Sequence, residues 1–169
     1  MESSRKMLYT FCMTQEKYKE FLSEYFSKDY SVGDFYLAKK YDLVAQSVQD
    51  ESFSRQNNTP FLNSVVYIVS FECDEQFVRK ELEKLPEIAL SGFRNSAKDK
   101  TSTIIRVFVM DEVSFGLIQE VRALKFSRSE FSPHRSYTEA RVLLVNLPSG
   151  EIYANMAGEA NVQEFKAMK

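Results

Sequence analysis

Five carboxylates come directly after two apolar runs, residues 65–71 and 103–110, which predict β-strands. They are Glu72, Asp74, Glu75, Asp111 and Glu112. If the two strands are parallel neighbours, these side chains emerge at one edge of the sheet, where open α/β sheets bind ligands. Carboxylate oxygens suit Mg²⁺ or Mn²⁺, so all but Glu72 are candidate ligands of a metal-dependent phosphoester hydrolase. The competing interpretation, which we favour, is that the acidic pairs begin two separate helices.

Basic and aromatic residues are interleaved in the second half of the chain. Residues 92–141 hold nine Lys and Arg against six Asp and Glu, although the whole chain has a formal net charge of −2. The candidate binding residues here are Arg122, Lys125, Arg128, Phe131, His134, Arg135 and Tyr137. Cations neutralise phosphates and exposed rings stack on bases, so residues 94–106 and 122–141 are candidate nucleic-acid contacts. The same residues suit an acidic protein surface equally well.

A nucleophilic dyad is a third, weaker hypothesis. Cys73 precedes an expected helix N-terminus, which lowers a thiol pKa, and His134 is the only histidine that could serve as its base. The carboxylates on both sides of Cys73 have the opposite effect on its pKa. We therefore favour a structural cysteine and an exposed loop histidine.

Several common catalytic motifs are absent from the sequence. Its five glycines are scattered singly and form no phosphate-binding loop, and no Gly-x-Ser-x-Gly motif occurs. A single histidine excludes paired-histidine phosphoesterases and histidine-ligated zinc proteases, and two cysteines are too few for a structural zinc site. These absences favour a protein that is not an enzyme and needs no cofactor.

Three units of a strand followed by a helix are expected to position these residues. The strands are the apolar runs 7–13, 65–71 and 103–110. The apolar stripes of the helices are Tyr18, Phe21, Leu22 and Tyr25, then Val78, Leu82 and Leu85, then Leu117, Ile118, Val121 and Leu124. Thr14 and Asp74 are the expected N-caps of the first two helices, and Pro86 is expected to end the second.

The region between the first two units is harder to interpret. Apolar residues at a spacing of about 3.6 favour an amphipathic helix over residues 34–50. A hairpin turning at residues 39–42 is the alternative. The polar residues 51–63 that follow predict a loop.

Two further loops and a hairpin complete the expected elements. The loops are at 92–102 and 127–137. The hairpin has strands at 141–147 and 151–156, joined by Pro148, Ser149 and Gly150, and residues 159–168 predict a short terminal helix.

These elements predict a single α+β domain spanning residues 1–169. It has a mixed sheet of about five strands with about four helices packed on it, and a ferredoxin-like arrangement is one candidate. The run 65–71 is apolar throughout and belongs in the middle of the sheet. The short apolar run at 7–13 does not resemble a signal peptide, and no run has the roughly 18 apolar residues of a membrane span, so we expect a cytoplasmic protein with no membrane partner.

The function that we favour is a non-catalytic interaction module: a regulator, inhibitor or adaptor of a larger macromolecular partner. Long irregular loops in small domains are often binding loops, which points to residues 127–137. Arg and aromatic residues dominate binding hot spots, so Arg128, Phe131 and Arg135 are the expected anchors. A nucleic-acid-binding protein and the metal-dependent hydrolase are the alternatives.

Overall fold

The computed structural model describes most of the chain in six segments. They are residues 13–29, 34–39, 42–53, 60–91, 99–130 and 136–166. In chain order the elements are α1 (Gln15–Asp29), β1 (Asp34–Lys39), β2 (Asp42–Phe53), β3 (Pro60–Ser70), α2 (Glu75–Ser91), β4 (Asp99–Met110), α3 (Phe115–Ala123), β5 (Ser127–Glu130), β6 (Ser136–Asn146), β7 (Glu151–Ala154), the 3₁₀ helix η1 (Ala157–Asn161) and α4 (Val162–Phe165).

The strands form one mixed sheet with the order β1-β2-β3-β4-β6-β5, and β7 also pairs with β6. Two neighbouring pairs, β3 with β4 and β4 with β6, are parallel, and the other pairs are antiparallel. The α+β class and the mixed sheet are therefore confirmed, and so is the central place of the run 65–71, whose residues 65–70 lie in β3 between β2 and β4. The sheet has seven described strands where we expected about five. The ferredoxin-like arrangement is not confirmed.

The helix predicted over residues 34–50 is wrong, and the alternative hairpin is correct. β1 and β2 pair antiparallel, with Leu37 opposite Leu43, and Lys39 opposite Asp42 at the turn. β2 then pairs with β3 over ten register positions from Asp42 to Phe53. Helix periodicity in a short segment is a weak signal, and backbone pairing with β3 overrides it.

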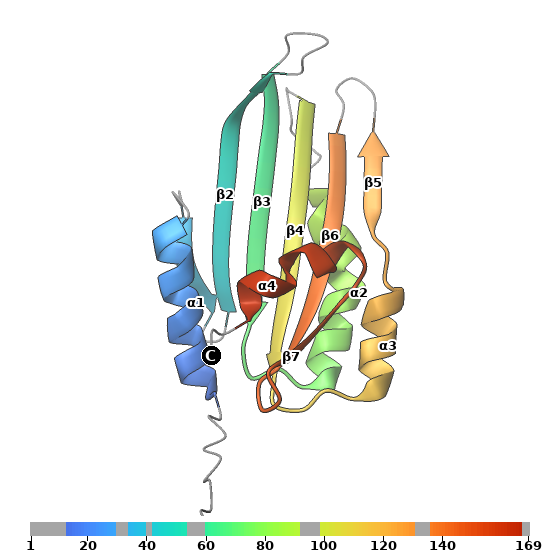
Figure 1. The fold of residues 1–169 in the computed structure, drawn as a ribbon. Helices are drawn as coiled ribbons and strands as arrows, with labels where there is room; N and C mark the ends of the chain where they lie inside the picture. The colour runs from blue at the N-terminus through green and yellow to red at the C-terminus, as the bar shows by residue number, and fades with distance from the viewer. Residues whose placement is uncertain are drawn as a thin grey trace, which may run out of the picture.

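The sheet is the middle of three layers, because successive residues of a strand point to opposite faces. One core lies between the sheet and helices α1 and α4, and its β4 residues are Ile105, Val107 and Val109. The other lies between the sheet and helices α2 and α3, and its β4 residues are Ile104, Phe108 and Met110. Figure 1 shows α2 behind β4 and β6, and η1 with α4 crossing in front of β3, β4 and β6.

Helices α1 and α2 begin at the predicted N-caps, whereas the cap of α3 and the end of α2 differ from the prediction. The Thr14 hydroxyl accepts the Lys17 amide at 3.3 Å, and Asp74 Oδ1 accepts the Phe77 amide at 2.7 Å, which confirms both N-caps. The cap of α3 is Ser114 rather than an acidic residue. The prediction that Pro86 ends α2 is wrong, since the helix continues to Ser91 although the proline has no amide to donate to the helix.

The predicted loops are shorter than expected, and the terminal hairpin is confirmed. Strands β2 and β3 take up residues at both ends of the predicted loop 51–63, β4 begins inside the predicted loop 92–102, and β5 occupies the start of the predicted loop 127–137. β6 and β7 form the hairpin, and η1 with α4 supplies the terminal helical segment. The predicted strand at 7–13 lies almost wholly outside the described residues.

Candidate binding site on the outer edge of the sheet

The acidic residues that follow β3 and β4 lie at the same end of the sheet, the arrangement expected only if the two strands are parallel neighbours. β3 and β4 are parallel neighbours with Ser70 opposite Phe108, so the residues that follow both strands emerge together. Asp74 is engaged as the N-cap of α2. Asp111 Oδ1 accepts a hydrogen bond from Gln15 Nε2 of α1 at 3.2 Å. The Gln15–Asp111 hydrogen bond attaches α1 to the end of β4, and the Asp74 cap stabilises the start of α2 directly after β3.

Glu75 connects the first turns of α2 and α3. Its carboxylate accepts hydrogen bonds from Ser114 and from Arg79, and together they lower the pKa of Glu75. The Ser114 hydroxyl also accepts the Leu117 amide at 3.2 Å. Arg79 also forms an ion pair with Glu120 of α3, with 3.0 Å between Nη2 of the arginine and Oε1 of the glutamate. Within the described residues, no group of three or more His, Cys, Asp or Glu side chains is arranged to hold a metal ion.

Cys73 is half-buried at the end of β3. Its Sγ lies 3.3 Å from the carbonyl oxygen of Ser70, and its amide donates to the Val109 carbonyl at 3.1 Å. His134, its proposed partner, lies outside the described residues. The dyad therefore stays a prediction.

Three of the candidate binding cations lie along one lateral edge of the molecule. Arg122 is in the last turn of α3, Lys125 follows that helix, and Arg128 is in β5; all three residues are exposed. Figure 1 shows α3 and β5 one above the other along the same edge of the sheet. Phe131 and Arg135 lie, like His134, outside the described residues.

Tyr137 is separated from these cations by the alternation of side chains along β-strands. Arg128 is opposite Thr138 and Ser129 is opposite Tyr137, so Arg128 and Tyr137 point to opposite faces of the sheet. The Tyr137 hydroxyl donates to Glu139 at 2.9 Å, and partial burial together with this hydrogen bond raises the pKa of Tyr137. Arg128 and Tyr137 therefore cannot act on one face as a single patch.

The backbone of β5 offers hydrogen-bonding groups at the outer edge of the sheet. The Ala140 amide donates to the Phe126 carbonyl at 3.0 Å, which makes this a hydrogen-bonded pair of the antiparallel ladder. Hydrogen-bonded and non-hydrogen-bonded pairs alternate along such a ladder. The backbone groups of Arg128 therefore also point toward β6, while the amides and carbonyls of Ser127 and Ser129 point away from it. Within the described residues, β5 pairs only with β6. We call Arg122, Lys125, Ser127, Arg128 and Ser129 the α3–β5 edge.

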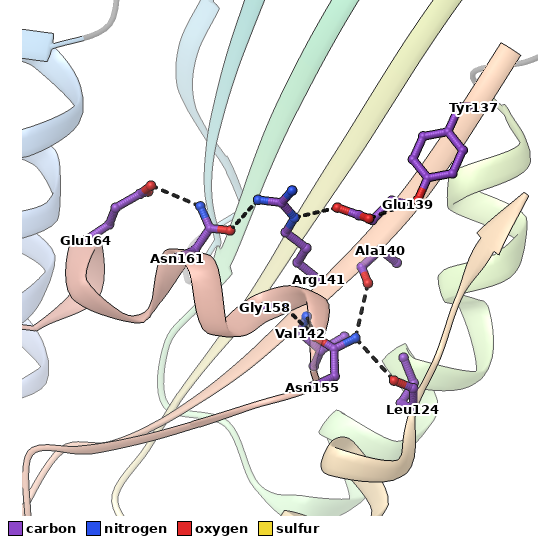
Figure 2. Close-up of polar contacts among 10 residues, drawn as sticks. All are labelled: Leu124, Tyr137, Glu139, Ala140, Arg141, Val142, Asn155, Gly158, Asn161 and Glu164. Carbon is purple, nitrogen blue, oxygen red and sulfur yellow. Dashed lines mark hydrogen bonds and ion pairs between the residues drawn. The ribbon is translucent and has the colours of Figure 1, made fainter.

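A buried asparagine holds the start of this edge in place (Figure 2). Asn155 is 1% exposed and its side chain makes four hydrogen bonds. Its Oδ1 accepts the amides of Val142 and Gly158, both at 2.9 Å. Its Nδ2 donates to the carbonyls of Leu124 at 3.3 Å and Ala140 at 3.2 Å. One amide thus ties together the exit of α3, the strand β6 and the start of η1.

A row of polar side chains crosses the face of the sheet that η1 and α4 cover (Figure 2). Arg141 donates to Glu139 at 2.6 Å and to Asn161 at 2.8 Å. Asn161 donates to Glu164 at 2.9 Å, and Glu164 accepts the Tyr67 hydroxyl at 2.9 Å. This row attaches η1 and α4 to β3 and β6. Glu139 and Arg141 have opposite charges and the two-residue spacing that places side chains on one face of a strand, but the strand predicted at 141–147 did not include Glu139.

Arg106, which lies within the predicted basic segment, is in the core instead. Its side chain is 3% exposed and forms an ion pair with Glu81 of α2, at 3.4 Å between Nη2 and Oε2. It also donates to the carbonyl of Ile68 and lies 4.1 Å from the centre of the Phe108 ring. This cation is therefore absent from the exposed basic surface.

No protein-family model, curated protein or solved structure matches the chain. None of the helices in the described segments is long and apolar enough to cross a bilayer.

Proposed function

We propose that the protein is a non-catalytic interaction module that binds a larger macromolecular partner through the α3–β5 edge, and so regulates, inhibits or adapts that partner. The observation that carries this proposal is the coincidence of two features on one edge. Three exposed cations lie beside two residues whose backbone groups point outward. Such an edge suits a partner that presents negative charge, polar hydrogen-bonding groups, or both.

The framework of the edge supports this proposal. The α3–β5 connection is held by the buried Asn155 amide, and α3 is joined to α2 through Glu75, Ser114 and the Arg79–Glu120 pair. A rigid framework lowers the entropy lost on binding, since fewer groups must be ordered. Arg122 also lies over the ring of Tyr153, 5.8 Å from its centre, which limits the orientations of its guanidinium.

The test is recovery of the tagged full-length chain from a lysate of its host, with and without nuclease. The variant Arg122→Ala/Lys125→Ala removes two cations of the edge and leaves β5 intact. The matched control, Lys80→Ala/Lys166→Ala, removes two exposed lysines from α2 and from the end of α4. Thermal unfolding of each variant checks that the fold is retained.

We expect a stoichiometric protein that resists nuclease, is retained by the control and is lost from the α3–β5 variant. Equal recovery by both variants would contradict the proposal. Loss of the partner on nuclease treatment would instead move the assignment to nucleic-acid binding, and that binding would weaken steeply with salt.

A further inference from the structure

We propose that two copies of the chain associate through β5, antiparallel about a two-fold axis, so that one sheet continues across the dimer. This inference rests on the proposed function, because it names a second copy of the chain as one partner of the α3–β5 edge. It follows from the pairing rules of β-strands and from the charges along β5.

The backbone of β5 is suited to strand addition. Ser127 and Ser129 turn their amides and carbonyls away from β6 and are exposed. Ser129 placed opposite Ser129 of a second copy exchanges two backbone hydrogen bonds in a hydrogen-bonded pair of a new antiparallel ladder. Exposed strand edges are templates for such pairing unless the chain blocks them, and β5 contains no proline.

The charges of β5 favour the register with Ser129 at the two-fold axis over the register shifted by one residue. With Ser129 at the two-fold axis, the positive residue 128 is directly opposite the negative residue 130 of the second copy, and symmetry makes this pair twice. These are non-hydrogen-bonded pairs, in which side chains are closest. With Arg128 at the axis, two Arg128 side chains would be directly opposite, and like charges at such positions are destabilising.

The symmetry of this contact limits assembly to two copies. An antiparallel β5 pair uses the same surface on both chains, so it is closed and leaves no free β5 edge. A strand of four residues makes a small interface, so we expect a Kd of about 10–100 µM, at the weak end of specific association. Association that depends on exposed ion pairs also weakens as salt increases.

Sedimentation of the full chain over roughly 1 to 500 µM, a range that spans the expected Kd, tests the proposal. We expect a monomer–dimer equilibrium. The single variants Arg128→Glu and Glu130→Arg are expected to raise the Kd about tenfold or more, because each places like charges opposite one another. The double variant Arg128→Glu/Glu130→Arg restores the opposite charges and should return the Kd to within about threefold of the original.

Two further variants separate backbone pairing from general effects of charge. Ser129→Pro removes an outward amide that β6 does not use, so it should abolish the dimer without lowering the Tm. Lys80→Glu makes the same change of charge as Arg128→Glu at an exposed residue of α2, outside the α3–β5 edge, and should leave the Kd unchanged.

A chain that stays monomeric over the whole range would overturn the inference, as would a double variant no better than the single ones. Open-ended polymers would also overturn it, since they require a different pairing, such as β5 with β1. These failures are distinct from failure of the proposed function. A monomeric chain that still loses its lysate partner in the Arg122→Ala/Lys125→Ala variant would leave that function standing.

Discussion

Replacing Asn155 with alanine is expected to be among the most destabilising single changes on this side of the molecule. The side chain is 1% exposed and its amide serves four backbone groups, those of Leu124, Ala140, Val142 and Gly158. Alanine removes all four hydrogen bonds and admits no polar group that could replace them. The reasoning assigns the loss to unsatisfied hydrogen bonds rather than to lost apolar packing.

The size of the stability loss depends on whether each backbone group bonded to Asn155 finds another hydrogen-bond partner. The Gly158 amide keeps a second acceptor, the backbone carbonyl of residue 155 at 3.0 Å, so it is not left unpaired. The Val142 amide loses the acceptor found here, and a buried unsatisfied donor costs about 1–3 kcal/mol. The hydrogen bonds to the carbonyls of Leu124 and Ala140 add about 0.5–1.5 kcal/mol each. We therefore expect the free energy of unfolding to fall by about 2–6 kcal/mol.

Urea unfolding followed by circular dichroism measures this loss. Gln119→Ala, which replaces an exposed amide on α3, is the control and should change stability by less than about 0.5 kcal/mol. Asn155→Asp is the diagnostic variant. It keeps the acceptor but turns a carboxylate oxygen toward two carbonyl oxygens, which raises its pKa in the folded state.

Because the folded protein then holds the proton of this aspartate more tightly than the unfolded chain, the stability deficit of Asn155→Asp should shrink as the pH falls through the raised pKa. A loss below about 1 kcal/mol for Asn155→Ala, typical of a surface substitution, would refute the reasoning. So would a deficit of Asn155→Asp that is the same at pH 7 and at low pH.

Three further predictions concern other contacts of the described structure. In Gly158→Ala the new Cβ would lie 2.7 Å from Asn155 Oδ1, so unfolding experiments should show a loss of about 1–3 kcal/mol, and an unchanged stability would contradict the close packing. Burial opposes ionisation of Glu81, but its cationic neighbours, including Arg106, outweigh burial and lower its pKa. The ion pairs of Glu81 therefore stabilise the fold fully above the pKa of the unfolded chain, and this stabilisation is lost as the pH falls through the pKa of the folded protein. The gap between the native chain and Glu81→Gln, about 1–3 kcal/mol at pH 7, should therefore narrow as the pH falls below the unfolded value of about 4.3, and a gap that does not depend on pH would contradict the pairing. Pro86→Ala restores a backbone donor inside α2 and should stabilise by about 1–2 kcal/mol, whereas no gain would indicate that the helix ends there.

Local chemistry made several elements predictable. Thr14 and Asp74 begin helices because a side-chain oxygen can accept an amide that the first turn leaves unpaired. The apolar run in β4 required a strand buried on both faces, and its alternate residues fill two separate cores. The sequence did not determine whether β3 and β4 are parallel neighbours, and it is this pairing that brings the two acidic strand ends to one end of the sheet.

Other features depended on contacts between residues far apart in sequence. The periodicity of residues 34–50 favoured a helix over a hairpin, and pairing of β2 with β3 overrode that preference. Arg106 and Arg128 are both basic residues in the same half of the sequence. The first is buried against Glu81 and the second lies at an exposed edge, because α2 covers one position and no described element covers the other.

The residues that hold the α3–β5 edge in place were the least accessible to sequence reasoning. Asn155 was predicted only as part of the strand 151–156, and its four hydrogen bonds exist only once α3, β6 and η1 converge. Residue type and periodicity determine which segments become helices or strands and which side chains could do chemistry. Which of those side chains meet, and which edge of the sheet stays open, follows from strand order and burial, which depend on the whole chain at once.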